Sequence, residues 1–193
     1  NSHFFNNNGK KMKMNPLVKQ FLAETILKTS IRAPSRLNLP PTTLRIALEQ
    51  LCRVFPRAKD VEIRSLRLAG IRAEEIKPQP KTTQMILHIH GGAFFLGSMK
   101  THRAFLTQIA ARTQMQVLHL DYPLSPESTY PEALDALVDV YQVLLDQGVQ
   151  AKDIILSGDS CGANLALALT LQLKREHKPL PSGLMLLSPF LDL

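Results

Sequence analysis

A serine stands between two glycines in the segment GDSCG (158–162). The apolar residues before it predict a buried strand over 153–158, and the periodicity after it predicts a helix over 161–175. A strand-to-helix turn this sharp leaves no room for side chains two residues before or after the serine. The turn carries the Ser160 hydroxyl to a helix N-terminus, where free N–H groups favour negative charge. The pattern suits nucleophilic acyl transfer, although a lone G-x-S-x-G also occurs in ordinary turns.

A second loop of small residues, HGGAF (90–94), follows a predicted buried strand over 84–90. Acyl transfer passes through a tetrahedral oxyanion that needs preorganised N–H donors, and small residues let a backbone approach the substrate closely. Losing one such donor typically slows the reaction by a factor on the order of 100–1,000. Two glycines alone would be read as a turn that ends a strand. Their pairing with the serine turn favours an oxyanion loop.

A third segment, DYPLSPE (121–127), follows the predicted strand over 116–122. Taken alone it is an ordered, proline-punctuated loop. Together the three segments resemble the hormone-sensitive lipase family of α/β-hydrolase carboxylesterases. That family has H-G-G-G, D-Y-R-L-A-P-E and G-D-S-A-G-G-N where this chain has HGGAF, DYPLSPE and GDSCGAN, in the same order. The likeness covers roughly residues 60–193.

The resemblance implies a role for each matching residue. Ser160 would be the nucleophile, and the oxyanion hole would be formed by N–H groups from the set Gly91, Gly92, Ala93 and Cys161. The activity implied is hydrolysis of short- to medium-chain carboxylic esters through an acyl-enzyme. The resemblance implies no cofactor and no metal. The implied fold is an α/β-hydrolase with an N-terminal helical cap.

The chain departs from the family pattern at several positions, of which four bear on the site. Ala93 replaces the third glycine; its N–H group is retained, but we expect an alanine to restrict the loop to negative φ. Pro123 and Ser125 replace the family's Arg and Ala. Cys161 replaces an Ala, which adds bulk beside the nucleophile, and we expect its backbone N–H to matter more than its thiol.

A serine hydroxyl needs a histidine to take its proton and a carboxylate to orient that histidine. In this fold both follow the serine in the chain. The residues of those types after Ser160 are Glu176, His177 and Asp192. His177 lies at the end of the predicted helix, far from its start, which favours a surface histidine.

The remaining candidates precede the serine. His90 belongs to the oxyanion loop, and we interpret the other three upstream histidines as sheet or helix residues and two aspartates as loop scaffolding: His88, His102, His119, Asp121 and Asp159. We therefore expect the base and its carboxylate to come from beyond residue 193, either as a separate chain of the same protein or in a longer sequence. Alone, this chain is then expected to be close to inactive.

Two other functions remain open. A non-catalytic protein on the same scaffold could bind a small acid between the serine turn and the oxyanion loop. A peptidase or an acyltransferase would use the same turn and differ mainly in the acceptor of the acyl group. The acyl chain length, the alcohol portion and the oligomeric state do not follow from the residues.

The elements that position these loops follow from periodicity. Helices are predicted over 15–29 and 41–54, and strands over 61–68 and 71–77. From residue 84 strands and helices alternate, with helices over 101–113 and about 130–147 and a last strand over 182–189. This order predicts an α/β fold with a mostly parallel sheet and helices on both faces, incomplete at its C-terminal end. The expected divisions are a tail (1–13), a helical cap segment (14–56) and a hydrolase core (57–193).

Composition excludes several other classes. The chain has 193 residues, of which 45% are apolar and 20% charged, as in ordinary globular proteins. We expect no stable membrane insertion, because no apolar run approaches the roughly 20 residues that span a bilayer. Its two cysteines predict free thiols and a cytoplasmic location. Residues 1–81 hold 16 Lys/Arg against 6 Asp/Glu. This excess is read as a solvated surface, because no aromatic interleaving supports nucleic-acid binding.

Overall fold

The computed structural model describes residues 39–79 and 82–191. The predicted tail (1–13), the predicted helix over 15–29 and most of the predicted cap segment (14–56) lie outside the described residues. Residues Pro41–Leu193 belong to one compact unit. The assignment of a helical cap therefore stays a prediction.

The elements follow the predicted order closely. In chain order they are α3 (Pro41–Cys52), β1 (Val61–Leu68), β2 (Ile71–Pro78), β3 (Met85–Ile89), α4 (Met99–Thr113), β4 (Gln116–Leu120), α5 (Glu132–Asp146), the short 3-10 helix η1 (Ala151–Asp153), β5 (Ile154–Asp159), α6 (Cys161–Arg175) and β6 (Gly183–Leu187). Only η1 was not predicted, because three residues are too few to show a period.

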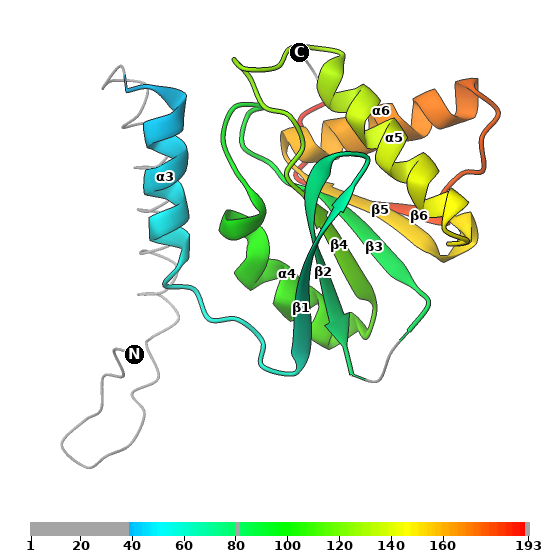
Figure 1. The fold of residues 1–193 in the computed structure, drawn as a ribbon, viewed down its shortest axis with the longest axis horizontal. Helices are drawn as coiled ribbons and strands as arrows, with labels where there is room; N and C mark the ends of the chain where they lie inside the picture. The colour runs from blue at the N-terminus through cyan, green and yellow to red at the C-terminus, as the bar shows by residue number, and fades with distance from the viewer. Residues whose placement is uncertain (1–38, 80–81, 192–193) are drawn as a thin grey trace. The chain divides into compact units, whose positions relative to one another are not determined.

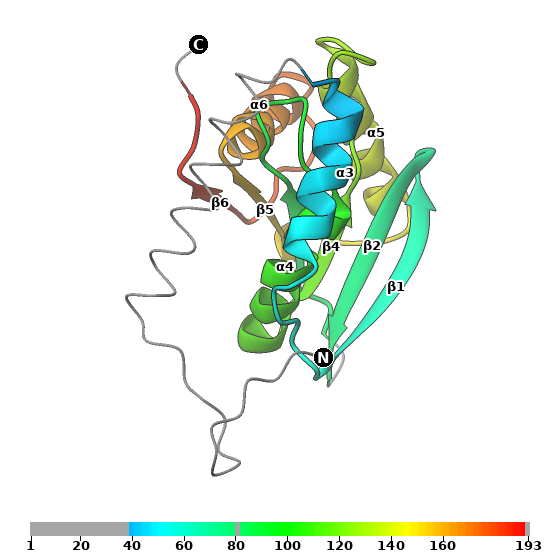
Figure 2. The same ribbon diagram turned by 90° about the vertical axis from the view of Figure 1, so that its left-hand side faces the viewer.

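The strands form one six-stranded sheet in the order β1-β2-β4-β3-β5-β6 (Figure 1). β1 pairs antiparallel with β2, and β2 pairs antiparallel with β4. The three remaining pairings, β3 with β4, β3 with β5 and β5 with β6, are parallel. Figure 2 shows β1 at one edge of the sheet and β6 at the other. The prediction of a mostly parallel sheet is confirmed.

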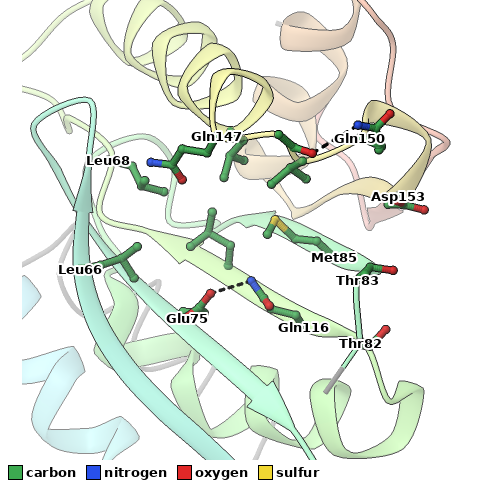
Figure 3. Close-up of a pocket in the computed structure, with 14 residues that line it drawn as sticks. Leu66, Leu68, Glu75, Thr82, Thr83, Met85, Gln116, Gln147, Gln150 and Asp153 are labelled. Atoms are coloured by element: carbon green, nitrogen blue, oxygen red, sulfur yellow. Dashed lines mark hydrogen bonds between the residues drawn. The ribbon is translucent and has the colours of Figure 1, made fainter. Parts of the chain in front are cut away.

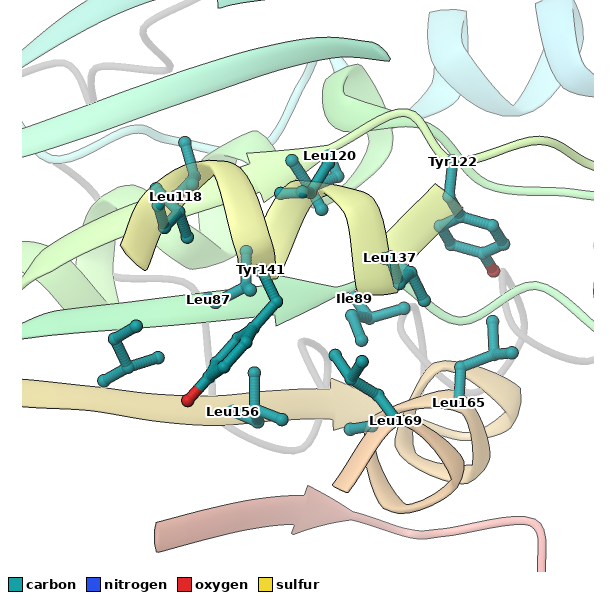
Figure 4. Close-up of a cluster of buried hydrophobic side chains, with 14 of the residues drawn as sticks. Leu87, Ile89, Leu118, Leu120, Tyr122, Leu137, Tyr141, Leu156, Leu165 and Leu169 are labelled. Carbon is teal, nitrogen blue, oxygen red and sulfur yellow. The ribbon is translucent and has the colours of Figure 1, made fainter. Parts of the chain in front are cut away.

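Helices cover both faces of the sheet. Successive side chains of a strand point to opposite faces, and the buried strands are apolar at nearly every position, so both faces must be covered. On one face, Leu87, Ile89 and Leu156 pack with residues of α5 and α6, among them Leu137, Tyr141 and Leu169 (Figure 4). On the other face, Ile86 and Val117 pack with Leu106 and Ala110 of α4. The sheet therefore has two apolar faces, and the buried strands read as nearly continuous apolar runs.

Helix α4 begins at a defined residue, which fixes where the loop after β3 ends. Ser98 is its N-cap, and its side chain and that of Thr101 form a capping box. The Asp121 carboxylate accepts the N–H of Met99 at 2.7 Å. These contacts join the start of α4 to the end of β4.

Within residues 39–79 and 82–191, no helix has both the length and the apolar character needed to cross a bilayer. Cys52 is half-buried, Cys161 is buried, and both are free thiols.

Candidate active site

Ser160 occupies the turn between β5 and α6. It is the N-cap residue of α6, with φ 53° and ψ −121°, and it is exposed. A non-glycine residue in such a region costs on the order of 1–3 kcal/mol and persists only where its surroundings enforce it. Cβ atoms added at Gly158 and Gly162 would collide with the backbone of Gly162 and Ile89 respectively. The two glycines are therefore required by close backbone packing, as the sequence predicts.

Backbone hydrogen bonds hold this turn from both sides. The Ser160 N–H donates to the carbonyl oxygen of Leu187 at 2.9 Å, and the Ser160 carbonyl accepts the N–H of Phe190 at 3.2 Å. Asn164, one helical turn further on, donates to the Phe190 carbonyl at 3.0 Å. The Ser160 hydroxyl makes no capping bond to α6 and is free to meet a ligand.

The loop after β3 lies against this turn at two points. The N–H of Gly91 donates to Asp159 Oδ1 at 3.0 Å, and the N–H of Phe94 donates to Cys161 Sγ at 3.2 Å. Within the loop, the Leu96 N–H donates to the Gly92 carbonyl at 2.7 Å. The structure therefore brings the predicted oxyanion loop and the serine turn together. The Gly91 N–H group, however, is engaged by Asp159.

Ala93 does not hold the loop at negative φ, so that expectation was wrong. Its φ is 52°, and Phe94 follows with φ 65°. The left-handed region costs an L residue about 1–2 kcal/mol but is not closed to it. The bonds made by Gly91 and Phe94 on either side of Ala93 explain how the loop keeps this conformation.

The thiol of Cys161 is part of the loop's anchorage, which the sequence did not reveal. It is fully buried, and it accepts the Phe94 N–H while lying 4.0 Å from the Tyr122 hydroxyl oxygen. Burial raises the pKa of this thiol, so it stays protonated at neutral pH. The only signal in the sequence was a cysteine where the family pattern has alanine.

Asp159 holds the loop after β3 in place, which agrees with its interpretation from the sequence as loop scaffolding. Its carboxylate accepts the Gly91 N–H and lies 3.3 Å from His88 Nε2 and 3.3 Å from His102 Nε2. Burial alone would raise the pKa of Asp159, but hydrogen bonds with His102 and His88 outweigh it and hold that pKa well below its usual value. Asp159 is therefore ionised.

Four histidine rings cluster near Asp159, and each ring centroid lies 5.5–6.0 Å from at least two of the others: His88, His90, His102 and His119. Burial lowers the pKa of His88 and His119, and it lowers the pKa of His90 to about 3. Three rings are therefore neutral at neutral pH. In the described part of the chain no three His, Cys, Asp or Glu residues are arranged to hold a metal ion.

None of the described histidines is bonded to the Ser160 hydroxyl. His88 Nδ1 lies 3.1 Å from Ser157 Oγ, and His90 Nδ1 lies 2.9 Å from the Gly91 carbonyl. His177 is exposed and follows α6, and a 15-residue helix is about 22 Å long.

A cavity of about 360 Å³ opens beside the loop and the start of α6. Its wall is mainly apolar and includes Phe94, Tyr122, Leu134, Leu165 and Ala168, with Asn164 among the polar groups. Cavities of this size and character hold small organic ligands. Its place at the carboxyl ends of parallel strands is where open α/β sheets bind ligands.

A second cavity, of about 400 Å³, lies at the other end of the sheet (Figure 3). Met85 and Gln116, the first residues of β3 and β4, line it, and Gln116 donates a hydrogen bond to Glu75 at 2.8 Å. The loops around Ser160 contribute nothing to this cavity. It is therefore not part of the candidate active site.

Comparison with known proteins agrees with this architecture. A family profile described as the alpha/beta hydrolase fold matches residues 86–193. A protein named "Esterase" from Acinetobacter venetianus is 62% identical over 182 residues, which cover 94% of this chain and 60% of that protein.

Solved structures agree as well. The crystal structure of an esterase from the bacterial hormone-sensitive lipase family superposes with a TM-score of 0.83 at 31% identity, covering 94% of this chain and 60% of the other. A hormone-sensitive lipase from a metagenome library gives a TM-score of 0.83 at 36% identity, covering 94% and 59%. This chain thus spans about 60% of the length of these proteins. It belongs to the α/β-hydrolase family.

Proposed function

We propose that Ser160 is the nucleophile of a carboxylesterase that hydrolyses short- to medium-chain esters. The observation that carries the proposal is the exposed hydroxyl of Ser160 on a turn at positive φ, beside a loop that is bonded to that turn through Gly91 and Phe94. The likeness to a protein named "Esterase" supports the same activity.

In the proposed reaction, Ser160 Oγ attacks the ester carbonyl and its proton passes to a histidine. The N–H groups of Gly92, Ala93 and Cys161 donate to the oxyanion that forms. Gly91 is omitted because its N–H already donates to Asp159. The alcohol leaves with the histidine's proton, and water then attacks the acyl-enzyme and releases the acid.

We propose that the histidine and its carboxylate come from protein sequence that follows Leu193 or from a separate chain. Support comes from the described histidines, of which His88, His90 and His119 are buried neutral rings. Of the other two described histidines, His102 places its Nε2 3.3 Å from Asp159 Oδ1, and His177 lies beyond the far end of α6. The described part of the chain therefore offers Ser160 no base. Loss of the catalytic histidine can cost about a million-fold in turnover. The 193 residues alone should then hydrolyse esters about a million-fold more slowly than the complete enzyme, at the residual rate that the oxyanion donors and substrate binding provide.

The cavity beside Phe94 and Asn164 is the proposed place for the apolar portion of the ester. Its mainly apolar wall favours a short alkyl or aryl group over a charged one. This cavity opens where the oxyanion loop and the start of α6 meet, so a carbonyl held by the loop could extend its chain there.

A chimera tests the proposal. The 193 residues are joined to the part of the Acinetobacter venetianus esterase that follows its matched segment, and hydrolysis of p-nitrophenyl acetate, butyrate and octanoate is measured. We expect turnover by the chimera, with loss by about a million-fold on Ser160→Ala. The unjoined chain is the matched control and should be close to inactive. A chimera that folds but retains turnover after Ser160→Ala would contradict the proposal.

The lack of a described histidine at Ser160 favours one other candidate, a non-catalytic protein that binds a small acid at the same place. A fluorophosphonate probe distinguishes the two, because it reacts with a serine that a base activates. Labelling of Ser160 in the chimera supports the esterase. An unlabelled but folded chimera that binds butyrate at the cavity supports the binding protein.

A further inference from the structure

Arg45 of α3 bridges the oxyanion loop and the loop between β4 and α5. Its Nε donates to the Phe95 carbonyl at 2.8 Å, and one of its terminal nitrogens donates to the Ser125 carbonyl at 2.6 Å. Both terminal nitrogens also donate to the Glu127 carboxylate, at 2.9 and 2.8 Å. One guanidinium therefore joins three residues that lie 50 to 82 positions away in the chain.

Few other bonds join these two loops. The Ser125 N–H donates to the Phe94 carbonyl at 2.9 Å. Arg45 adds a bond to the Phe95 carbonyl on the side of the oxyanion loop, and bonds to Ser125 and Glu127 in the loop between β4 and α5. A side chain with the fork geometry of arginine can make these bonds at once, whereas a lysine cannot.

The oxyanion loop needs such external support. Ala93 and Phe94 are successive residues at positive φ, a conformation that L residues rarely adopt unless their surroundings enforce it. Phe95, whose carbonyl Arg45 binds, directly follows them. The Arg45 side chain is only 20% exposed, so its bonds to the two carbonyls are partly shielded from competing water.

The same helix holds the far end of the loop. Glu49, one helical turn after Arg45, accepts the hydroxyl of Ser98 at 2.8 Å and the ammonium of Lys100 at 2.8 Å. Helix α3 thus binds the segment after β3 at two places, through Arg45 at Phe95 and through Glu49 at Ser98. α3 also packs against α4, which begins where the loop ends.

We propose that Arg45 is a positioning residue: from α3 it holds the oxyanion loop in the conformation that presents the Gly92 and Ala93 N–H groups to the substrate. The inference rests on the proposed function for its catalytic meaning, but the positioning itself can be measured without turnover. Without the guanidinium, the loop opens more often and exposes the thiol of Cys161, which the loop now covers.

The test measures alkylation of Cys161 by iodoacetamide in a Cys52→Ser background, read by mass spectrometry. Arg45→Met is expected to raise the rate about tenfold, the change that about 1.4 kcal/mol of loop-closing free energy produces. Arg53→Met removes a charge from the residue just beyond α3 and should leave the rate unchanged. Arg45→Lys keeps the charge but not the fork, so the rate should stay raised.

Two further measurements separate loop opening from global unfolding. Urea unfolding is followed for each variant, and hydrogen exchange is followed at the Leu96 N–H, which closes the turn of the loop. Faster alkylation and faster exchange at an unchanged unfolding free energy support the proposal. If Arg45→Met does not fold, Glu127→Gln is used, which weakens the fork's carboxylate contact and should give a smaller increase.

Equal alkylation rates in Arg45→Met and Arg53→Met would overturn the proposal, and so would full restoration by Arg45→Lys, because charge alone would then suffice. In the chimera, Arg45→Met is expected to lower kcat and leave KM unchanged, since the oxyanion donors act in the transition state. An inactive chimera would count against the proposed function and would leave the alkylation result standing.

Discussion

Asp159 accepts the N–H of Gly91 at 3.0 Å and so joins the residue before Ser160 to the oxyanion loop. A Cβ atom on Gly91 would collide with the same carboxylate. The two segments therefore meet with no space between them, and the position of one fixes the position of the other.

Replacing Asp159 should destabilise the fold to different extents depending on the substitute. Asp159→Asn keeps an acceptor for the Gly91 N–H, whereas Asp159→Ala leaves that N–H and a His102 nitrogen unpaired. We expect Asp159→Ala to lower the unfolding free energy by about 1–3 kcal/mol more than Asp159→Asn. Urea unfolding at neutral pH measures the difference.

The pH dependence of the unfolding free energy tests whether the charge of Asp159 contributes to this stability. The pKa of the Asp159 carboxyl is depressed in the folded state, so its charge stabilises the fold above the unfolded pKa of about 3.9 and loses that effect as the pH falls further. The gap between wild type and Asp159→Asn should be constant near neutrality and narrow below about pH 4. A gap that widens there would contradict this account.

Acid should destabilise the protein through its buried histidines. His88, His90 and His119 have lowered pKa values in the folded state, that of His90 reaching about 3. Below about pH 6.5 the unfolded chain takes up protons that the folded chain does not. The unfolding free energy should therefore fall with pH, by up to about 1.4 kcal/mol per unit for each ring.

His119 offers the sharpest check, because both of its ring nitrogens are buried without a partner in the described residues. His119→Leu should reduce the slope of unfolding free energy against pH between 6.5 and 5. Equal slopes for wild type and His119→Leu would mean that His119 does not contribute.

Gly162→Ala should be strongly destabilising, because its Cβ would collide with the carbonyl oxygens of Ile89 and His90. We expect a loss of about 2 kcal/mol or more, since neither backbone can move easily. Gly183→Ala is the control: no atom lies within 4 Å of its added Cβ, and a change within about 0.5 kcal/mol is expected. Thermal and urea unfolding both measure these losses. Equal losses of unfolding free energy in Gly162→Ala and Gly183→Ala would contradict the prediction.

Ala93→Gly should stabilise the protein, which is unusual for this substitution. Glycine relieves the cost of φ 52°, and the net gain expected is about 0.5 kcal/mol after the entropy of the unfolded chain is counted. Ala136→Gly, past the first turn of α5 (Glu132–Asp146), should instead cost about 1 kcal/mol. Urea unfolding of the two variants should therefore give changes of opposite sign.

The sequence predicted the parts of this molecule that depend on local pattern. The periodicity placed β5, α6 and the turn at Ser160 within a residue or two, and the glycines of that turn indicated tight packing. It could not predict contacts that depend on strand order and register. His88 and His119 meet because β3 and β4 pair in parallel at that position, and Arg45 reaches Glu127 across 82 residues.

The close approach of Gly162 to the backbone of Ile89 has a practical consequence for redesign. It ties the first turn of α6 to β3 at a point where neither side chain nor solvent intervenes. The cavity wall at Leu165 and Ala168 begins just beyond that point on the same helix. Larger or smaller residues there would reshape the space for a ligand while Ser160 keeps its place. Under the proposed function, selectivity for the ester and reactivity of the serine would then vary separately.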